Sequence, residues 1–165
     1  MPNWCDNTIT IQGSTETVKT LWDEASAMDS KGSGGLLEAM HPIGAWDYNT
    51  AVEEWGTKWD VDLEGLEFTD NGDGTSSITG WASSAWAPPI NAFSKFSDSM
   101  DGVYCELKYY EPGMDFIGVW DSEGGDAYWE NIAEMVAKGE HKEDTVLAEL
   151  VEDFGVEPLE EEEMA

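Results

Sequence analysis

Two histidines, two cysteines and 36 acidic residues are the side chains of this 165-residue sequence that could carry out acid–base or nucleophilic chemistry. A nucleophile needs an adjacent base held in place by a third group. The bases on offer are His41, which precedes a proline, and His141, in a charged linker, and neither has a motif around it. Cys5 with His41 is conceivable, but a cysteine is far more often a small buried hydrophobe. We expect no catalytic residue and no enzyme.

Metal and cofactor sites need spacings that this sequence does not show. The segment 70–75 superficially resembles a calcium loop, but its ligands do not alternate, and Trp81 stands where the last glutamate of such a loop is needed. The cysteines and histidines have no paired spacing for zinc, and no glycine-rich phosphate motif is present. We predict no metal and no cofactor, and we interpret 70–75 as a hairpin turn.

The tryptophans of the middle region suggest an alternative chemistry. Trp46, Trp55, Trp59 and Trp86 are candidates for stacking on a sugar, and a carboxylate pair could hydrolyse a glycosidic bond. With 36 acidic residues, close carboxylate pairs arise by chance, and core packing is the commoner role of tryptophan. A small hydrolase or carbohydrate-binding module stays an alternative, favoured by a deep pocket of these indoles with two facing carboxylates.

Charge is the strongest compositional feature. The formal net charge is −29, with seven lysines and no arginine against the 36 acids. Such a surface repels phosphates and anionic lipids, so we expect no direct nucleic-acid binding and no membrane binding. The expected partner is a basic host protein. A second alternative is an accessory protein whose acidity serves only solubility or adaptation to salt.

The acidity is densest near the C-terminus, where residues 121–165 hold sixteen acids and two lysines. Carboxylates spaced i,i+4 on a helix lie about 6 Å apart along its axis, comparable to neighbouring phosphates of one DNA strand. They also destabilise an isolated helix by about 0.2–0.5 kcal/mol per pair, so a helix need not carry them. The predicted partner-binding residues are Glu130, Glu134, Glu149, Glu152, Asp153, Glu160, Glu161, Glu162 and Glu163.

Periodicity predicts the elements that must position these groups. Alternation over Thr8–Ile11 indicates a strand, and Ser14 can cap a helix whose apolar face repeats at helical spacing. A second amphipathic helix is expected from Ile90 to Met100, and helices are expected over 127–138 and 144–154. Further strands are expected from Val61 and over 66–69, 77–81, 103–110 and 114–120.

The predicted order is β-α-β-β-α-β, followed by one strand and two helices. This order favours an α+β fold with a ferredoxin-like βαββαβ antiparallel sheet, helices on one face, an extra strand and a C-terminal helical hairpin. We divide the chain into a core over 1–125, an acidic helical extension packed on it over 126–156, and a disordered acidic tail over 157–165. The polar N-terminus and the absence of a long apolar run favour an intracellular protein.

Four strings are similar to signature segments of the YubB-like ferredoxin-like domain family of phage and plasmid proteins. They are MPNWCDN at 1–7, WGTKWD at 55–60, AWAPP at 85–89 and GMDFIGVW at 113–120, and the resemblance spans roughly residues 1–125. It implies a ferredoxin-like α/β sandwich without an iron–sulfur cluster, and a viral or mobile-element origin. The family carries no biochemical activity that can be transferred. This chain departs from it in having no arginine and in its acidic extension.

The family topology implies that the first and last strands of the core pair antiparallel. Cys5 begins the first of these strands and Cys105 stands near the start of the last, so the two should lie at opposite ends. That separation exceeds the roughly 7 Å between Cα atoms that a disulfide can span, so two free thiols are expected.

These features together predict a function by binding. We expect an acidic phage-type protein in the cytoplasm of an infected host cell. It would occupy a basic, nucleic-acid-binding surface of a host protein and act as an inhibitor or DNA mimic, such as an anti-restriction or anti-CRISPR factor.

Overall fold

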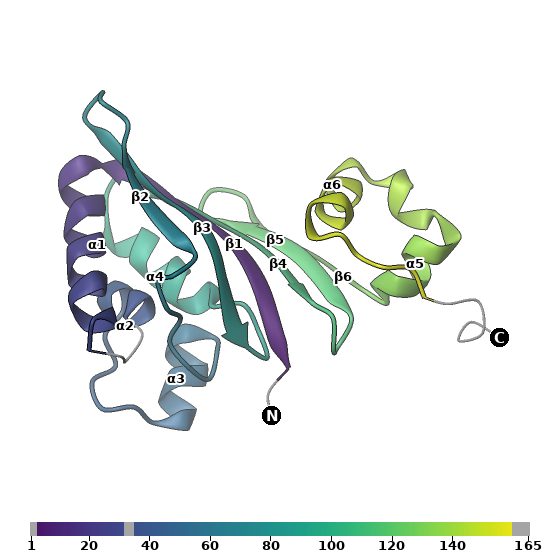
Figure 1. The fold of residues 1–165 in the computed structure, drawn as a ribbon, viewed down its shortest axis with the longest axis horizontal. Coiled ribbons are helices and arrows are strands. Elements are labelled where there is room, and N and C mark those ends of the chain that lie inside the picture. Colours follow the sequence, from purple (N-terminus) through teal and green to yellow (C-terminus); the bar gives the residue numbers. More distant parts are fainter. Residues whose placement is uncertain (1–2, 32–34, 160–165) are drawn as a thin grey trace.

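The computed structural model describes residues 3–31 and 35–159, which form one six-stranded antiparallel sheet with helices on both faces (Figure 1). The strand order is β2-β3-β1-β4-β5-β6. In chain order the elements are β1 (Trp4–Ser14), α1 (Thr15–Asp29), α2 (Leu36–Met40), α3 (Tyr48–Trp55), β2 (Leu66–Asp70), β3 (Thr75–Ala85), α4 (Ile90–Ser99), β4 (Tyr104–Glu111), β5 (Phe116–Asp121), β6 (Gly125–Glu130), α5 (Ile132–Lys138), the 3-10 helix η1 (Glu140–Glu143) and α6 (Thr145–Phe154).

The central strand β1 pairs with β3 on one side and with β4 on the other. Its side chains alternate between the two faces of the sheet, as the sequence pattern predicts. Cys5, Asn7, Ile9 and Ile11 point to one face and are fully buried there. This face carries the main core of the protein.

Helices α1 to α4 cover that face, as Figure 1 shows in purple to teal. Helix α1 begins where predicted, because the Ser14 hydroxyl accepts the backbone N–H of Thr17 at 3.3 Å. Its apolar stripe of Val18, Leu21 and Ala25 is buried against the sheet. The amphipathic pattern of the sequence therefore identifies the packing face of this helix correctly.

The hairpin between β2 and β3 confirms the predicted turn. Gly72 and Gly74 adopt φ of 82° and 89°, and the backbone N–H of Asn71 donates to the Thr75 carbonyl at 3.0 Å. The carboxylates of Asp70 and Asp73 accept backbone N–H groups within the same turn. These aspartates are thus explained by turn geometry.

The order β1-α1-β2-β3-α4-β4 confirms the predicted α+β, ferredoxin-like βαββαβ core. The two short helices α2 and α3 lie between α1 and β2, and β5 and β6 extend the sheet beyond β4. The predicted strand from Val61 is wrong. Val61 lies in a loop, although its side chain is 1% exposed and belongs to the core.

The predicted helix over 127–138 is wrong in its first half, because residues 125–130 form the edge strand β6. Tyr128 fits a helical stripe with Ile132 by spacing alone, but it pairs with Gly118 of β5 in the sheet. The turn before β6 is fixed by Asp121, whose carboxylate accepts the backbone N–H of Glu123 at 2.8 Å and that of Gly124. Pairing with β5 thus overrides local periodicity.

Helices α5 and α6 lie on the face of the sheet opposite to α1–α4, at the β5–β6 end (Figure 1, green to yellow). Ile117 points from β5 to this face and packs with Ile132 and with Leu147, Leu150 and Val151 of α6. The chain continues packed as far as Leu159, whose backbone N–H donates to the Ala133 carbonyl at 2.9 Å. Residues 160–165 of the predicted tail lie outside the described residues.

The register confirms the predicted separation of the cysteines. Ile11 of β1 faces Cys105 of β4, which places Cys105 six positions along the strand from Cys5, roughly 20 Å. Both are free and buried. Over the described residues, the helices are too short or too polar to cross a bilayer.

Candidate functional site

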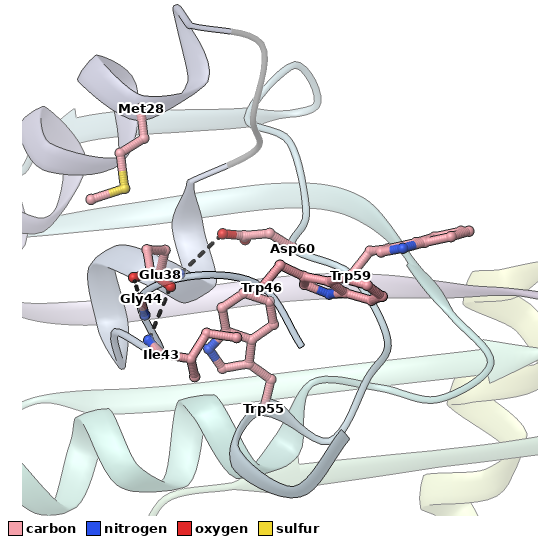
Figure 2. A pocket seen from close by; sticks show the side chains of 8 residues that line it. All are labelled: Met28, Glu38, Ile43, Gly44, Trp46, Trp55, Trp59 and Asp60. Atoms are coloured by element: carbon pink, nitrogen blue, oxygen red, sulfur yellow. Dashed lines mark hydrogen bonds between the residues drawn. The ribbon is translucent and has the colours of Figure 1, made fainter. Parts of the chain in front are cut away.

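A tryptophan-lined pocket opens between α2, the segment that follows it and the end of α3 (Figure 2). Its volume is about 460 Å³, within the usual range for small-ligand sites. The lining residues are Met28, Glu38, Ile43, Gly44, Trp46, Trp55, Trp59 and Asp60. Three of the four tryptophans that the sequence singles out therefore meet in one cavity.

Hydrogen bonds hold two of these indoles in place. The buried Trp55 donates its Nε1–H to the His41 carbonyl at 2.9 Å, and Trp46 donates to the Lys58 carbonyl at 2.9 Å. Trp46 keeps 51% of its surface exposed. Gly56 ends α3 in the left-handed region at φ 88° and turns the chain back towards Trp59. The pocket wall is thus preorganised.

The two carboxylates of the pocket are used by the backbone. Glu38 accepts the N–H groups of Ile43 and Gly44, both at 3.0 Å, as the dashed lines in Figure 2 show. Asp60 accepts the N–H groups of Leu37 at 2.7 Å and of Glu38 at 3.0 Å. Burial raises the pKa of Asp60, against the effect of these backbone hydrogen bonds. Both carboxylates therefore shape the loop, and neither stands as a free acid–base group.

Trp59 is shared with a second, smaller cavity of about 270 Å³. There it faces Trp4, with ring centroids 6.1 Å apart, and the Lys58 ammonium lies 4.4 Å from the Trp59 ring centroid. Trp4 was not among the predicted tryptophans, because nothing in the spacing places the first strand beside residue 59. Trp86, the fourth predicted tryptophan, lines a different cavity.

Three of the predicted partner-binding residues lie next to one another on the outer side of α6. Glu149, Glu152 and Asp153 are all exposed on this helix, opposite the buried Leu147 and Leu150. The Lys108 ammonium lies 4.0 Å from the Asp153 carboxylate. An exposed contact of this length adds little, so most of the negative charge of this face is not compensated locally. We call these three residues the α6 acidic face.

Glu130 and Glu134 do not form the predicted i,i+4 pair, which is a correction. Glu130 ends β6 and accepts the Tyr128 hydroxyl at 2.7 Å, whereas Glu134 lies in α5 and pairs with Lys138 at 2.9 Å. Asn131, at φ 57°, separates the strand from the helix. The predicted residues Glu160, Glu161, Glu162 and Glu163 lie outside the described residues.

Cys5 and His41 do not contact each other as a nucleophile and its base. The Cys5 thiol is buried in β1, which raises its pKa, and its Sγ lies 4.0 Å from the Asp6 carbonyl. His41 bonds through Nε2 to Glu54 of α3 at 2.7 Å. Among residues 3–31 and 35–159, no group of three or more Cys, His, Asp or Glu is arranged to hold a metal ion.

Comparison with known proteins gives one finding. A family model, described as a ferredoxin-like domain in Api92-like protein, matches residues 54–149. This match runs from the end of α3 into α6 and includes most of the sheet and part of the tryptophan pocket. Neither the curated proteins nor the solved structures contain a match.

Proposed function

The chain belongs to the family of ferredoxin-like domains in Api92-like proteins, and we propose that it is a binding protein and not an enzyme. It occupies a basic, nucleic-acid-binding surface of a host protein through its acidic helical end, and so acts as an inhibitor or DNA mimic of the anti-restriction or anti-CRISPR kind. The YubB-like resemblance supports a phage or plasmid origin, and with it a place in the cytoplasm of the host cell. Nucleic acid and membranes are not its partners.

The observation that carries this proposal is the α6 acidic face. Three exposed carboxylates at i, i+3 and i+4 stand on one side of a helix at the end of the molecule. Neighbouring carboxylates on such a helix lie at spacings comparable to phosphates, and they act on a cationic surface at long range. Segment 131–159 adds five further acids against two lysines, so the field of this end is negative.

The experiment compares two variants with the same change of charge. Glu149→Gln/Glu152→Gln/Asp153→Asn removes the α6 acidic face, whereas Glu24→Gln/Glu53→Gln/Glu67→Gln removes three exposed charges elsewhere. The tagged protein should recover a basic, nucleic-acid-binding host protein at about 50 mM salt and lose it at about 500 mM, because salt screens the contact. Duplex DNA should compete for that protein. Only the variant without the α6 acidic face should fail to recover the host protein.

Equal recovery by both variants, or recovery that does not depend on salt, would refute the proposal. Loss of recovery in both variants to the same degree would mean that overall charge matters and not this face, which also contradicts it. Thermal unfolding of both variants shows whether each is folded before it is used.

A second candidate function is supported by the tryptophan pocket. Trp46 and Trp59 present exposed indole faces beside an apolar cavity, as in small carbohydrate-binding modules. Titration with soluble oligosaccharides should quench tryptophan fluorescence in the wild type and not in Trp46→Ala. The hydrolase form of this alternative is less favoured, because Glu38 and Asp60 are engaged by backbone N–H groups.

A further inference from the structure

A further concave surface lies on the face of the sheet that α1 to α4 cover, between the β5–β6 end and the segment that leads into α4. It consists of two cavities of about 460 Å³ and 490 Å³ that share the lining residues Ala87, Phe116 and Tyr128. We call these joined cavities the aromatic trough. It is separate from the tryptophan pocket and shares no residue with the α6 acidic face.

The floor of the trough is a row of rings across three strands. Tyr109 of β4 contacts Phe116 of β5 at 6.1 Å between centroids, and Phe116 contacts Tyr128 of β6 at 5.6 Å. Exposed apolar groups stand around it: Met114 is 64% exposed and Trp86 is 45% exposed. Large apolar side chains that gather in a concavity and stay exposed are typical of binding sites.

Backbone strain is concentrated at the same place. Over the described residues, the non-glycine residues with positive φ are Trp86 at 73°, Asp115 at 61° and Asn131 at 57°. Trp86 and Asn131 line the trough, and Asp115 lies between the lining residues Met114 and Phe116, in the turn that leads into β5. The Asn3 carbonyl accepts the Trp86 N–H at 2.8 Å and so helps to hold this conformation. Conformations of this kind cost free energy and cluster at functional sites.

The charge of the trough has one sign. Its charged lining residues are Asp126 and Glu130, which project from β6 on the same side as Tyr128 because strand side chains alternate. The Asp126 carboxylate accepts a hydrogen bond from the Tyr109 hydroxyl at 2.8 Å. The Glu130 carboxylate accepts one from the Tyr128 hydroxyl at 2.7 Å. A single donor leaves most of the lone pairs of a carboxylate available. No lysine or histidine is among the residues that line the cavities.

Strand β6 also offers an edge. It is the last strand in the sheet order, so one row of its backbone N–H and C=O groups is not paired within the sheet. Its six residues include two acids that face the trough. An extended peptide can add to such an edge and place alternate side chains in neighbouring pockets. Two joined cavities beside an open strand edge therefore fit an extended chain better than a compact small molecule.

We propose that the aromatic trough and the edge of β6 bind an extended peptide segment of a partner protein that carries a lysine or arginine beside a large apolar residue. The apolar side chain lies between Trp86, Met114 and Phe116. The cationic group pairs with Asp126 or Glu130, where charge-assisted hydrogen bonds are stronger than neutral ones. This site does not depend on the α6 acidic face, so either proposal can fail while the other holds.

The test begins with selection of short random peptides on the full-length protein. Enrichment of sequences with Lys or Arg next to Leu, Phe or Trp is expected. A labelled synthetic peptide of the enriched sequence is then titrated by fluorescence anisotropy. Asp126→Asn/Glu130→Gln, which keeps side-chain size and one acceptor oxygen at each position, should weaken binding by about tenfold or more. Met114→Ala should weaken it as well, and because Met114 is largely exposed this variant should stay folded.

The matched control is Glu149→Gln/Glu152→Gln, which removes two charges from α6 and should bind the peptide as the wild type does. Four results would overturn the proposal. Two concern the selection: no enrichment, or enrichment of peptides without a basic residue. The other two are equal binding by the trough variants and the control, and competition by free arginine amide as strong as that by the peptide. The last result would assign the trough to a small organic cation.

Discussion

Gly118 of β5 lies directly opposite Tyr109 of β4, and its missing side chain leaves the space that the Tyr109 ring occupies. A Cβ atom on Gly118 would stand 2.4 Å from the Tyr109 hydroxyl oxygen and 2.5 Å from its Cζ. The ring can therefore pass over β5, and its hydroxyl donates to Asp126 of β6 at 2.8 Å. One glycine thus links the core strand β4 to the edge strand of the aromatic trough.

Gly118→Ala should destabilise the protein by about 1–3 kcal/mol, because the new methyl group overpacks the site. The Ala127 carbonyl oxygen would also lie only 2.6 Å from the added Cβ, so backbone as well as side chain must shift. Urea unfolding measures the change. In a Tyr109→Leu background the same glycine substitution should cost less, since part of the clash is gone. Equal costs in both backgrounds would contradict the proposed coupling of Gly118 to Tyr109.

Asn7 is the most connected buried polar side chain of β1. Its Nδ2 donates to the carbonyls of Cys5 at 3.2 Å and Ala82 at 3.1 Å and to the Ser84 hydroxyl at 2.9 Å. It is fully buried. Asn7→Ala removes these three buried hydrogen bonds and should cost about 1–3 kcal/mol in the free energy of unfolding.

The control for Asn7 is Asn91→Ala. Asn91 is exposed and donates to the Glu53 carbonyl at 3.1 Å, so its loss should change stability by no more than about 0.5 kcal/mol. A similar loss of stability in the two alanine variants would mean that burial does not set the importance of Asn7.

Glu54 gives the protein a specific sensitivity to acid. Hydrogen bonds from Lys95 and His41 hold the pKa of this carboxyl below its usual 4.5. The unfolded chain therefore takes up the proton more readily than the folded one as pH falls. The stabilisation is present in full above pH 4.5 and is lost as pH falls through the folded-state pKa.

Glu54→Gln should lower stability at about pH 6, and its difference from the wild type should shrink as the pH is taken to about 3.5. Urea unfolding at several pH values measures this. Glu53→Gln, which removes the neighbouring exposed charge, controls for the loss of one negative charge. A difference between Glu54→Gln and wild type that stays constant over the whole range would refute this assignment.

The sequence predicts an element well where local and tertiary preferences agree. The Ser14 cap, the apolar stripe of α1 and the hairpin at Gly72 follow from side-chain chemistry within a few residues, and the structure confirms each. Tyr128 shows the opposite case. Its spacing to Ile132 fits a helix, but the tight turn at Asp121 returns the chain along β5, and strand pairing prevails.

The candidate site was only partly predictable for the same reason. The spacing of Trp46, Trp55 and Trp59 kept them close in the chain, and the structure brings them together. Trp4 contacts Trp59 because of the register between β1 and β3, in which Trp4 lies opposite Ala85. The Thr57 hydroxyl donates to the Ala85 carbonyl, which brings the segment of Trp59 to the same place. Contacts between distant segments of this kind carry no local signal.

Neutralising the α6 acidic face separates a role in binding from a role in folding. Glu149 repels Glu152 and Asp153 at helical neighbour spacing, which costs about 0.2–0.5 kcal/mol for each pair. Glu149→Gln/Glu152→Gln/Asp153→Asn should therefore raise the free energy of unfolding slightly, and the gain should diminish as added salt screens the repulsion. The exposed 4.0 Å contact of Asp153 with Lys108 is too weak to reverse this sign.

Urea unfolding at about 20 mM and about 500 mM salt measures that gain. If the variant is instead less stable at low salt, these carboxylates support the fold, and their exposure needs no partner to explain it. If the variant is more stable and at the same time loses a basic partner, the chain keeps the repulsion at a cost to its own stability. A surface that is unfavourable in the free protein and favourable in a complex is what binding by charge mimicry requires.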